Sequence, residues 1–98
     1  MIGLDEVLRA LAHPDRRRFL LACRDRSFAA GELVELSSLS AATVSEHLKV
    51  LRKTGLLVLE RRGKQWLYRT DPAVARRAIA ETLVQVGETE TGGHGDGA

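Results

Sequence analysis

The stretch SAATVSEHLKVLRKTGLL, residues 40–57, keeps hydrogen-bonding side chains on one side of a predicted helix. Val44, Leu48 and Leu51 recur at helical spacing and predict its inward face. The outer side then carries small or polar residues: Ala42, Thr43, Ser45, Glu46 and Lys49. Small residues at the start of a helix allow it to enter the major groove of a duplex, where hydroxyl groups reach base edges or phosphates.

A group of positive charges lies at a predicted β-hairpin. The runs LLVLERR and KQWLYR favour strands, and Gly63 permits the turn between them. Arg61, Arg62 and Lys64 lie at this turn and offer their cations to a phosphate backbone or a minor groove. Together the helix and the hairpin predict a surface that binds double-stranded DNA.

Some neighbouring side chains allow two interpretations. Trp66 and Tyr68 lie on one strand face, and we expect both to pack against the domain rather than stack on bases. Glu46 either accepts a hydrogen bond from cytosine or is a solvated residue. The arginines at positions 16–18 either contact the DNA backbone or form a solvated face, and we favour the second.

The cysteine and the histidines are scattered along the sequence. Cys23 is either a thiol sensor or, as we favour, a small core residue. His13 is expected to cap a helix, His47 either contacts a phosphate or is half-buried, and His94 belongs to the tail. This spacing predicts no metal site and no cofactor. The chain also lacks a catalytic constellation, so we do not expect an enzyme.

Five helices and the hairpin must position these residues. The helices are expected at residues 4–12, 14–24, 30–36, 41–53 and 72–86. Ser40 and Asp71 are suitable caps for the last two, and Gly55 suits the end of the fourth. The expected fold is mainly α with a small β-hairpin, a winged helix-turn-helix with five helices plus a wing. Residues 1–86 form this domain, and the Gly-rich, acidic residues 87–98 are an expected disordered tail.

The composition agrees with one small domain of 98 residues. The formal net charge is only +2, but basic residues outnumber acidic ones in residues 1–71, which favours an anionic partner. A single cysteine excludes an intramolecular disulfide and fits a reducing cytosol. No apolar run approaches the ~18 residues of a membrane span, so we expect a cytoplasmic protein with no membrane partner.

Several segments carry a resemblance to a known family. LAHPDRRRFLL, GELVELSSLSAATVSEHLKVLRKTGLL and RRGKQWLYR resemble the ArsR/SmtB winged-helix repressors, in the same order and spacing. The resemblance implies a homodimer joined by its first and last helices, which occupies an operator and releases it when an inducer arrives. It also implies a set of DNA-contacting positions: Ser40, Ala41, Thr43, Ser45, Glu46 and His47.

The sequence departs from the family at the usual metal sites. Many relatives carry cysteines in the third helix, and GELVELSS has none. Others use Asp and His pairs on the last helix, where this chain has Asp71 and Glu81 but no His. Two alternatives therefore stay open beside a DNA-binding repressor: a metal-responsive repressor with an atypical site, and a winged-helix protein-interaction module that binds no DNA.

Apolar stripes on the two terminal helices support the dimer. A domain with few aromatic residues has little need of both stripes for its own core, and a chain of this size gains stability by association. The predicted interface residues are Leu4, Val7, Leu8, Leu11, Ala75, Ile79, Leu83 and Val86.

Overall fold

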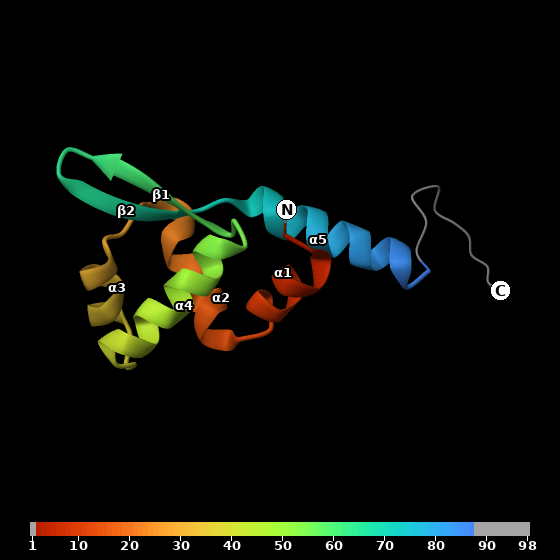
Figure 1. Cartoon of the computed structure of the whole chain (residues 1–98), viewed down its shortest axis with the longest axis horizontal. Helices are drawn as coiled ribbons and strands as arrows, with labels where there is room; N and C mark the ends of the chain where they lie inside the picture. The colour runs from red at the N-terminus through yellow and green to blue at the C-terminus, as the bar shows by residue number, and fades with distance from the viewer. Residues whose placement is uncertain (1, 88–98) are drawn as a thin grey trace.

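The computed structural model describes residues 2–87, which form five helices and one two-stranded sheet (Figure 1). The elements are α1 (Leu4–Leu11), α2 (Pro14–Asp25), α3 (Ala30–Leu36), α4 (Ala41–Lys53), β1 (Leu57–Arg62), β2 (Gln65–Thr70) and α5 (Pro72–Gln85). This is the mainly α fold with a hairpin that the sequence predicts. The predicted disordered tail lies outside the described residues, except for Gly87.

Side chains that accept hydrogen bonds set the starts of three helices. His13 Nδ1 accepts from the Asp15 amide at 3.3 Å, Ser40 Oγ from Thr43 at 3.1 Å, and Asp71 Oδ1 from Ala73 at 3.0 Å. Such caps satisfy amide groups that have no partner within the helix. The caps predicted at His13, Ser40 and Asp71 are therefore confirmed.

The core is built mainly from leucines where α4 meets α2, α3 and the start of β1. Its largest fully buried side chains are Leu33, Leu48, Leu51, Leu56, Leu57, Val44 and Cys23. Gly55 turns the chain from α4 into β1 with a φ of +83°, a left-handed conformation that glycine adopts without strain. The sequence thus places α4 firmly on the domain through its apolar side.

The β1–β2 hairpin, called the wing below, is anchored at its base. The strands are antiparallel, from the pair Leu57–Thr70 at the base to Arg62–Gln65 near the tip. Phe28, in the connection between α2 and α3, adds an isolated bridge: Phe28 and Tyr68 exchange backbone hydrogen bonds of 3.0 and 2.7 Å. Thr70 Oγ1 also donates to the Leu20 carbonyl of α2 at 2.6 Å.

The terminal helices pack on each other at one side of the core. Figure 1 shows α5 running beside α1 and continuing past it. Val7 is only 5% exposed and Ala78 only 4%, so both belong to the core of the single chain. Val7 is therefore a wrong choice for a dimer interface, because α1 turns it inward. Ile79, Leu83 and Val86 remain exposed.

Among the described residues, the structure has no helix that is both long enough and apolar enough to cross a membrane.

Candidate nucleic-acid interface

Helix α4 has one buried side and one exposed side. Val44, Leu48 and Leu51 are buried as predicted. The outer residues that the sequence predicts to contact DNA are all exposed: Ser40, Ala41, Thr43, Ser45, Glu46 and Lys49. The first turn of α4 contains no acidic side chain, so the positive end of its helix dipole is uncompensated. This end of α4 therefore favours an anionic group such as a phosphate.

The hydroxyl groups at the start of α4 are arranged by the helix cap. Ser40 Oγ accepts from the Thr43 amide at 3.1 Å and donates to Thr43 Oγ1 at 3.0 Å. In the preceding connection, the Leu39 amide donates to Ser37 Oγ at 2.7 Å. Because these bonds orient both hydroxyls, Ser40 and Thr43 are presented together on the exposed surface.

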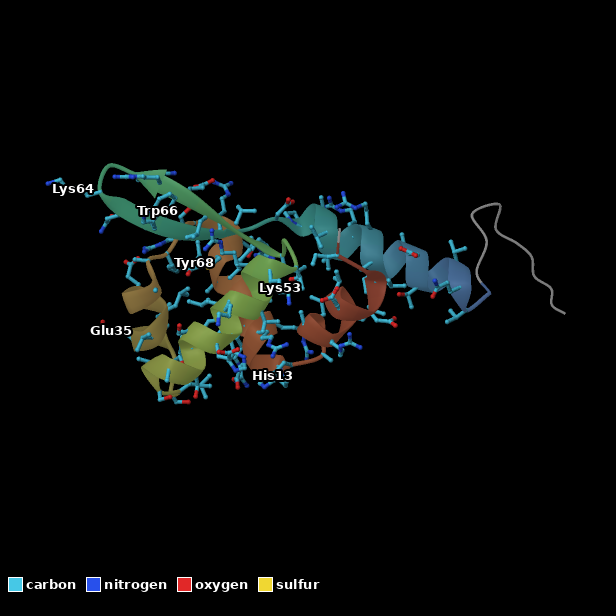
Figure 2. The ribbon with its side chains drawn as sticks, viewed as in Figure 1. His13, Glu35, Lys53, Lys64, Trp66 and Tyr68 are labelled. Carbon is cyan, nitrogen blue, oxygen red and sulfur yellow. The ribbon has the colours of Figure 1, made fainter. Side chains whose placement is uncertain are left out.

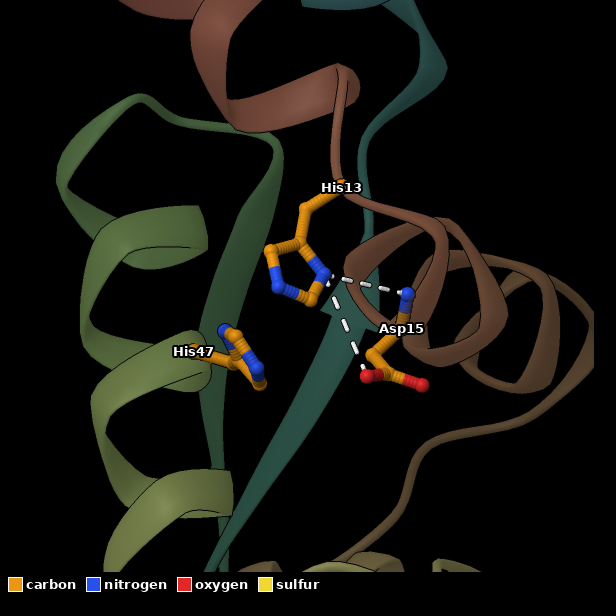
Figure 3. Close-up of side chains that lie close together, drawn as sticks. All are labelled: His13, Asp15 and His47. Carbon is orange, nitrogen blue, oxygen red and sulfur yellow. Dashed lines mark hydrogen bonds and ion pairs between the residues drawn. The ribbon is translucent and has the colours of Figure 1, made fainter.

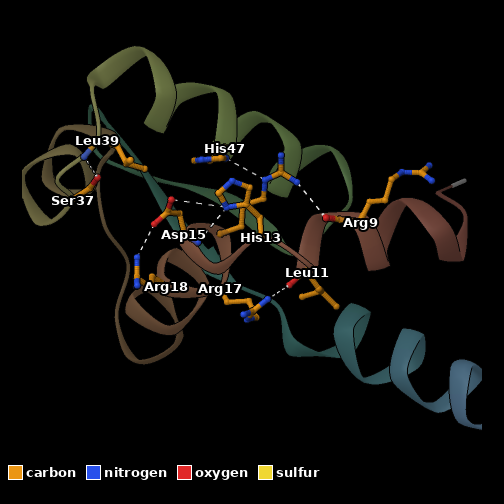
Figure 4. A network of polar contacts seen from close by, with 10 residues as sticks. Arg9, Leu11, His13, Asp15, Arg17, Arg18, Ser37, Leu39 and His47 are labelled. Atoms are coloured by element: carbon orange, nitrogen blue, oxygen red, sulfur yellow. Dashed lines mark hydrogen bonds and ion pairs between the residues drawn. The ribbon is translucent and has the colours of Figure 1, made fainter.

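His47 does not belong to the exposed surface, which corrects its assignment as a DNA-contacting residue. Its side chain is inside the domain, and the whole residue is only 7% exposed. The ring centroid lies 4.4 Å from that of His13, and His47 Nδ1 accepts from Arg16 Nε at 3.2 Å. Burial first, then the charges of His13 and Arg16, lower the pKa of His47. A neutral His47 therefore joins α4 to α2 (Figure 4).

The fold also brings together histidines that the sequence separates. His13, Asp15 and His47 each offer a ligand atom, and these atoms all lie within 4.8 Å of one another. Figure 3 shows the His13 ring between the other two side chains. The sequence analysis expects no metal site because the histidines are scattered along the chain, and the packing of α2 on α4 nevertheless brings His13 and His47 together. Two features of the sequence could have indicated this contact: His13 begins a helix, and His47 lies on the inward stripe of the fourth helix.

The wing carries exposed cations at and near its tip. Arg61, Arg62 and Lys64 are all exposed, and Gly63 makes the turn with a φ of +60°. Arg61 Nε donates to the Gly63 carbonyl at 3.0 Å, which holds that guanidinium along the turn. Lys64 lies at the far end of the hairpin, away from the helices (Figure 2). The tip can therefore reach a polyanion beside α4.

Trp66 is exposed, although the sequence analysis expects it to pack against the domain. The residue is 53% exposed, whereas Tyr68 is half-buried against the core. The two residues share a strand face, but the hairpin extends past the helices and only its base is covered. The Arg61 guanidinium lies 5.5 Å from the centre of the Trp66 ring, within the range of a cation–π contact.

The arginines at positions 16–18 make polar contacts within the chain, although Arg17 and Arg18 are exposed. Arg17 Nη1 donates to the Leu11 carbonyl at 2.6 Å, and Arg18 Nη1 contacts Asp15 Oδ1 at 2.7 Å (Figure 4). Arg16 contacts His47, as described above. The Arg17 bond ties α2 to the end of α1, the Arg16 bond joins α2 to α4, and the Arg18 contact lies within α2.

Cys23 is fully buried in the core. Burial raises the pKa of its thiol to about 11, so the reactive thiolate is scarce at neutral pH. The interpretation of Cys23 as a core residue is confirmed.

Comparisons with known proteins agree with this architecture. A family model described as "Helix-turn-helix domain" matches residues 11–60. The HTH-type transcriptional repressor SmtB of Mycobacterium tuberculosis is 34% identical over 83 residues, covering 85% of this chain and 62% of SmtB. The chain thus spans less than two thirds of the length of the curated relatives it matches.

Solved structures show the same fold. An ArsR-like transcriptional regulator from Rhodococcus sp. RHA1 superposes with a TM-score of 0.75 at 26% identity, covering 86% of this chain and 78% of that one. The homodimeric winged helix-turn-helix DNA-binding domain of Mb0332 from Mycobacterium bovis, a possible ArsR-family regulator, gives 0.64 at 25% identity, covering 98% and 100%. These relatives are named as regulators, in agreement with the expectation that the chain is not an enzyme. The chain belongs to the ArsR/SmtB family of winged helix-turn-helix transcriptional regulators.

Proposed function

We propose that the protein is a dimeric, sequence-specific DNA-binding repressor that places α4 in the major groove and the wing on the DNA backbone. The observation that carries the proposal is the exposed side of α4, which combines small and polar residues with an uncompensated helix start. The names of the relatives, which include transcriptional repressors, support repression as the outcome of binding.

The two elements have different roles in this proposal. Thr43 and Ser45 contribute hydroxyl groups of the kind that read base edges, and the Ser40 and Ala41 region lies where a phosphate is favoured. Glu46 and Lys49 complete the α4 surface. Arg61, Arg62 and Lys64 neutralise phosphates, which raises affinity for any sequence. His47 makes no DNA contact in this scheme, because it is buried inside the domain.

Residues 1–86 form both the DNA-binding and the dimerisation domain in this proposal. Ile79 is 49% exposed, Leu83 43% and Val86 74%, and apolar groups at this spacing form a stripe along α5. An exposed apolar stripe favours association. The other proposed interface residues are Leu4, Leu8, Leu11 and Ala75, which are partly buried. The homodimeric state of the Mb0332 domain supports a homodimer here.

The proposed repressor does not use the usual metal sites of its family. Neither α3 nor α5 contains a cysteine or a histidine. A tetrahedral zinc site built from such ligands therefore has no basis in these helices. Native mass spectrometry of a variant lacking both His13 and His47 tests this point, and retention of stoichiometric zinc would contradict it.

Duplex binding at several salt concentrations tests the main proposal. The probes are palindromic duplexes from the DNA flanking the coding region and a random duplex of equal length. Fluorescence anisotropy should show tight binding to one palindrome, with affinity that falls steeply as salt rises. Absence of duplex binding at low salt would instead indicate a protein-interaction module.

Single substitutions test the division between α4 and the wing. Arg62→Ala should weaken binding to all duplexes alike and lower the salt slope by about one, because a phosphate contact carries no sequence information. Thr43→Ala and Ser45→Ala should act on the preferred duplex, by ~1–3 kcal/mol for each lost base contact. Arg24→Ala removes an exposed arginine outside both elements and is the control. A change in sequence preference with Arg62→Ala would contradict the assignment.

A further inference from the structure

We infer that His13, Asp15 and His47 bind a divalent first-row transition metal ion between the start of α2 and the middle of α4. The site differs in position from the α3 and α5 positions discussed above. It requires neither DNA nor a second subunit, so it is independent of the proposed function. Its residues come from the α1–α2 connection, the first turn of α2 and α4.

The three side chains already converge in the structure. One ligand atom from each lies within 4.8 Å of the others, and the two imidazole rings are 4.4 Å apart at their centroids. Asp15 Oδ1 contacts Arg18 at 2.7 Å, whereas Asp15 Oδ2 lies 4.0 Å from His13 Nδ1. Ligand atoms around a tetrahedral metal with bonds of about 2 Å lie about 3.3 Å apart, so a contraction of up to about 1.5 Å brings these atoms to that spacing.

A cation already occupies one side of this cluster. Arg16 Nε donates to His47 Nδ1 at 3.2 Å, and Arg16 Nη1 makes a long contact of 3.5 Å with the Arg9 carbonyl. His47 Nδ1 therefore has its lone pair directed at a positive group. A metal ion at this nitrogen takes the place of the guanidinium, and Arg16 turns away into solvent. Metal binding through His47 Nδ1, the nitrogen we assign to the ion, and the Arg16–His47 bond exclude each other.

The ligand types define the class of ion. Two imidazoles and one carboxylate suit zinc, cobalt and nickel, whereas magnesium and calcium prefer oxygen ligands alone. A metal ion takes each imidazole in its neutral form, through a nitrogen lone pair. Such a three-ligand set leaves further positions of the ion to water.

The experiment measures metal binding to the full chain without an affinity tag. Cobalt is added in increments and followed by its visible absorption, and zinc affinity is measured by competition with a chromophoric chelator. We expect one ion per chain. If neither cobalt nor zinc binds at one ion per chain, the inference is overturned.

Matched variants locate the ion. His13→Asn removes an imidazole but keeps a good helix cap, so the fold is retained. His13→Asn and His47→Gln should each lower zinc affinity by at least about tenfold. Arg16→Ala should raise it, since the competing cation is gone. His94→Ala, which removes a histidine outside the described residues, is the control and should change nothing.

The pattern across variants decides the result, with folding checked by circular dichroism. If His47→Gln fails to fold, His13→Asn and Arg16→Ala carry the test. Unchanged zinc affinity in His13→Asn overturns the inference, as does a loss of the ion in His94→Ala. An affinity that Arg16→Ala fails to raise also overturns it, because adventitious binding to surface histidines has no dependence on this arginine.

Discussion

Replacement of Ser40 separates the stability of α4 from its proposed contact with DNA. Ser40 Oγ accepts a 3.1 Å hydrogen bond from the Thr43 amide, and the side chain is exposed, so little packing is lost with it. Ser40→Ala leaves that amide without its partner and should lower the free energy of unfolding by ~1 kcal/mol. For a domain of this size, that loss corresponds to a fall in Tm of roughly 4–8 °C.

Two further substitutions at the same position provide the comparison. Ser40→Asn keeps the cap and should preserve both stability and DNA binding. Ser40→Asp also keeps the cap and suits the helix dipole, but it places a negative charge where a phosphate is proposed. Ser40→Asp should therefore retain the Tm and lose affinity for every duplex.

Urea unfolding at one fixed protein concentration measures the stability, because dimerisation makes it concentration-dependent. Anisotropy with operator and random duplexes measures binding. A Ser40→Ala variant as stable as the original chain would refute the role of the cap. A Ser40→Asp variant that binds DNA normally would refute the proximity of Ser40 to a phosphate.

Other predictions concern the wing anchor, the thiol and the dimer. Thr70→Val removes the 2.6 Å bond to the Leu20 carbonyl and should lower the free energy of unfolding by about 1 kcal/mol, measured in urea. Cys23 should react with a thiol reagent at pH 8 only after denaturation. Because its pKa is raised from 9.0 to about 11, its contribution to stability is fully present below pH 9 and should be lost as the pH rises through 11, which pH-dependent unfolding checks. Leu83→Glu should yield monomers in sedimentation, whereas Glu81→Gln, a control at an exposed α5 residue, should not; monomeric behaviour of the unmodified chain would contradict the dimer.

Local patterns were sufficient to predict the elements of this fold. Ser40 and Asp71 mark helix starts because their side chains satisfy nearby amides, which depends only on neighbouring residues. The inward stripe of α4 likewise follows from spacing. His47 belongs to that stripe, three residues after Val44 and four before Leu51. Its burial was therefore readable from the sequence, and the resemblance to the family drew it into the DNA-contacting set instead.

Long-range geometry was not available from the sequence. The approach of His13 to His47 depends on how α2 crosses α4, which no local pattern specifies. Trp66 and Tyr68 share a strand face, but Tyr68 is half-buried and Trp66 is exposed, because the helices cover only the base of the hairpin. Val7 shows the same difficulty. The apolar stripe of the first helix predicted that Val7 lies in a dimer interface, and only the packing of α1 shows that it is buried within its own chain.

Asp71 is the single residue between the end of β2 and the start of α5. Its amide donates to the Leu56 carbonyl at 3.0 Å while its carboxylate caps α5, so the wing and α5 are joined by a short, hydrogen-bonded connection. In the proposed dimer, a rotation of α5 against its partner is passed directly to the wing. If α5 joins the subunits as proposed, it would also set the separation of the two wings and the phasing of the two DNA half-sites.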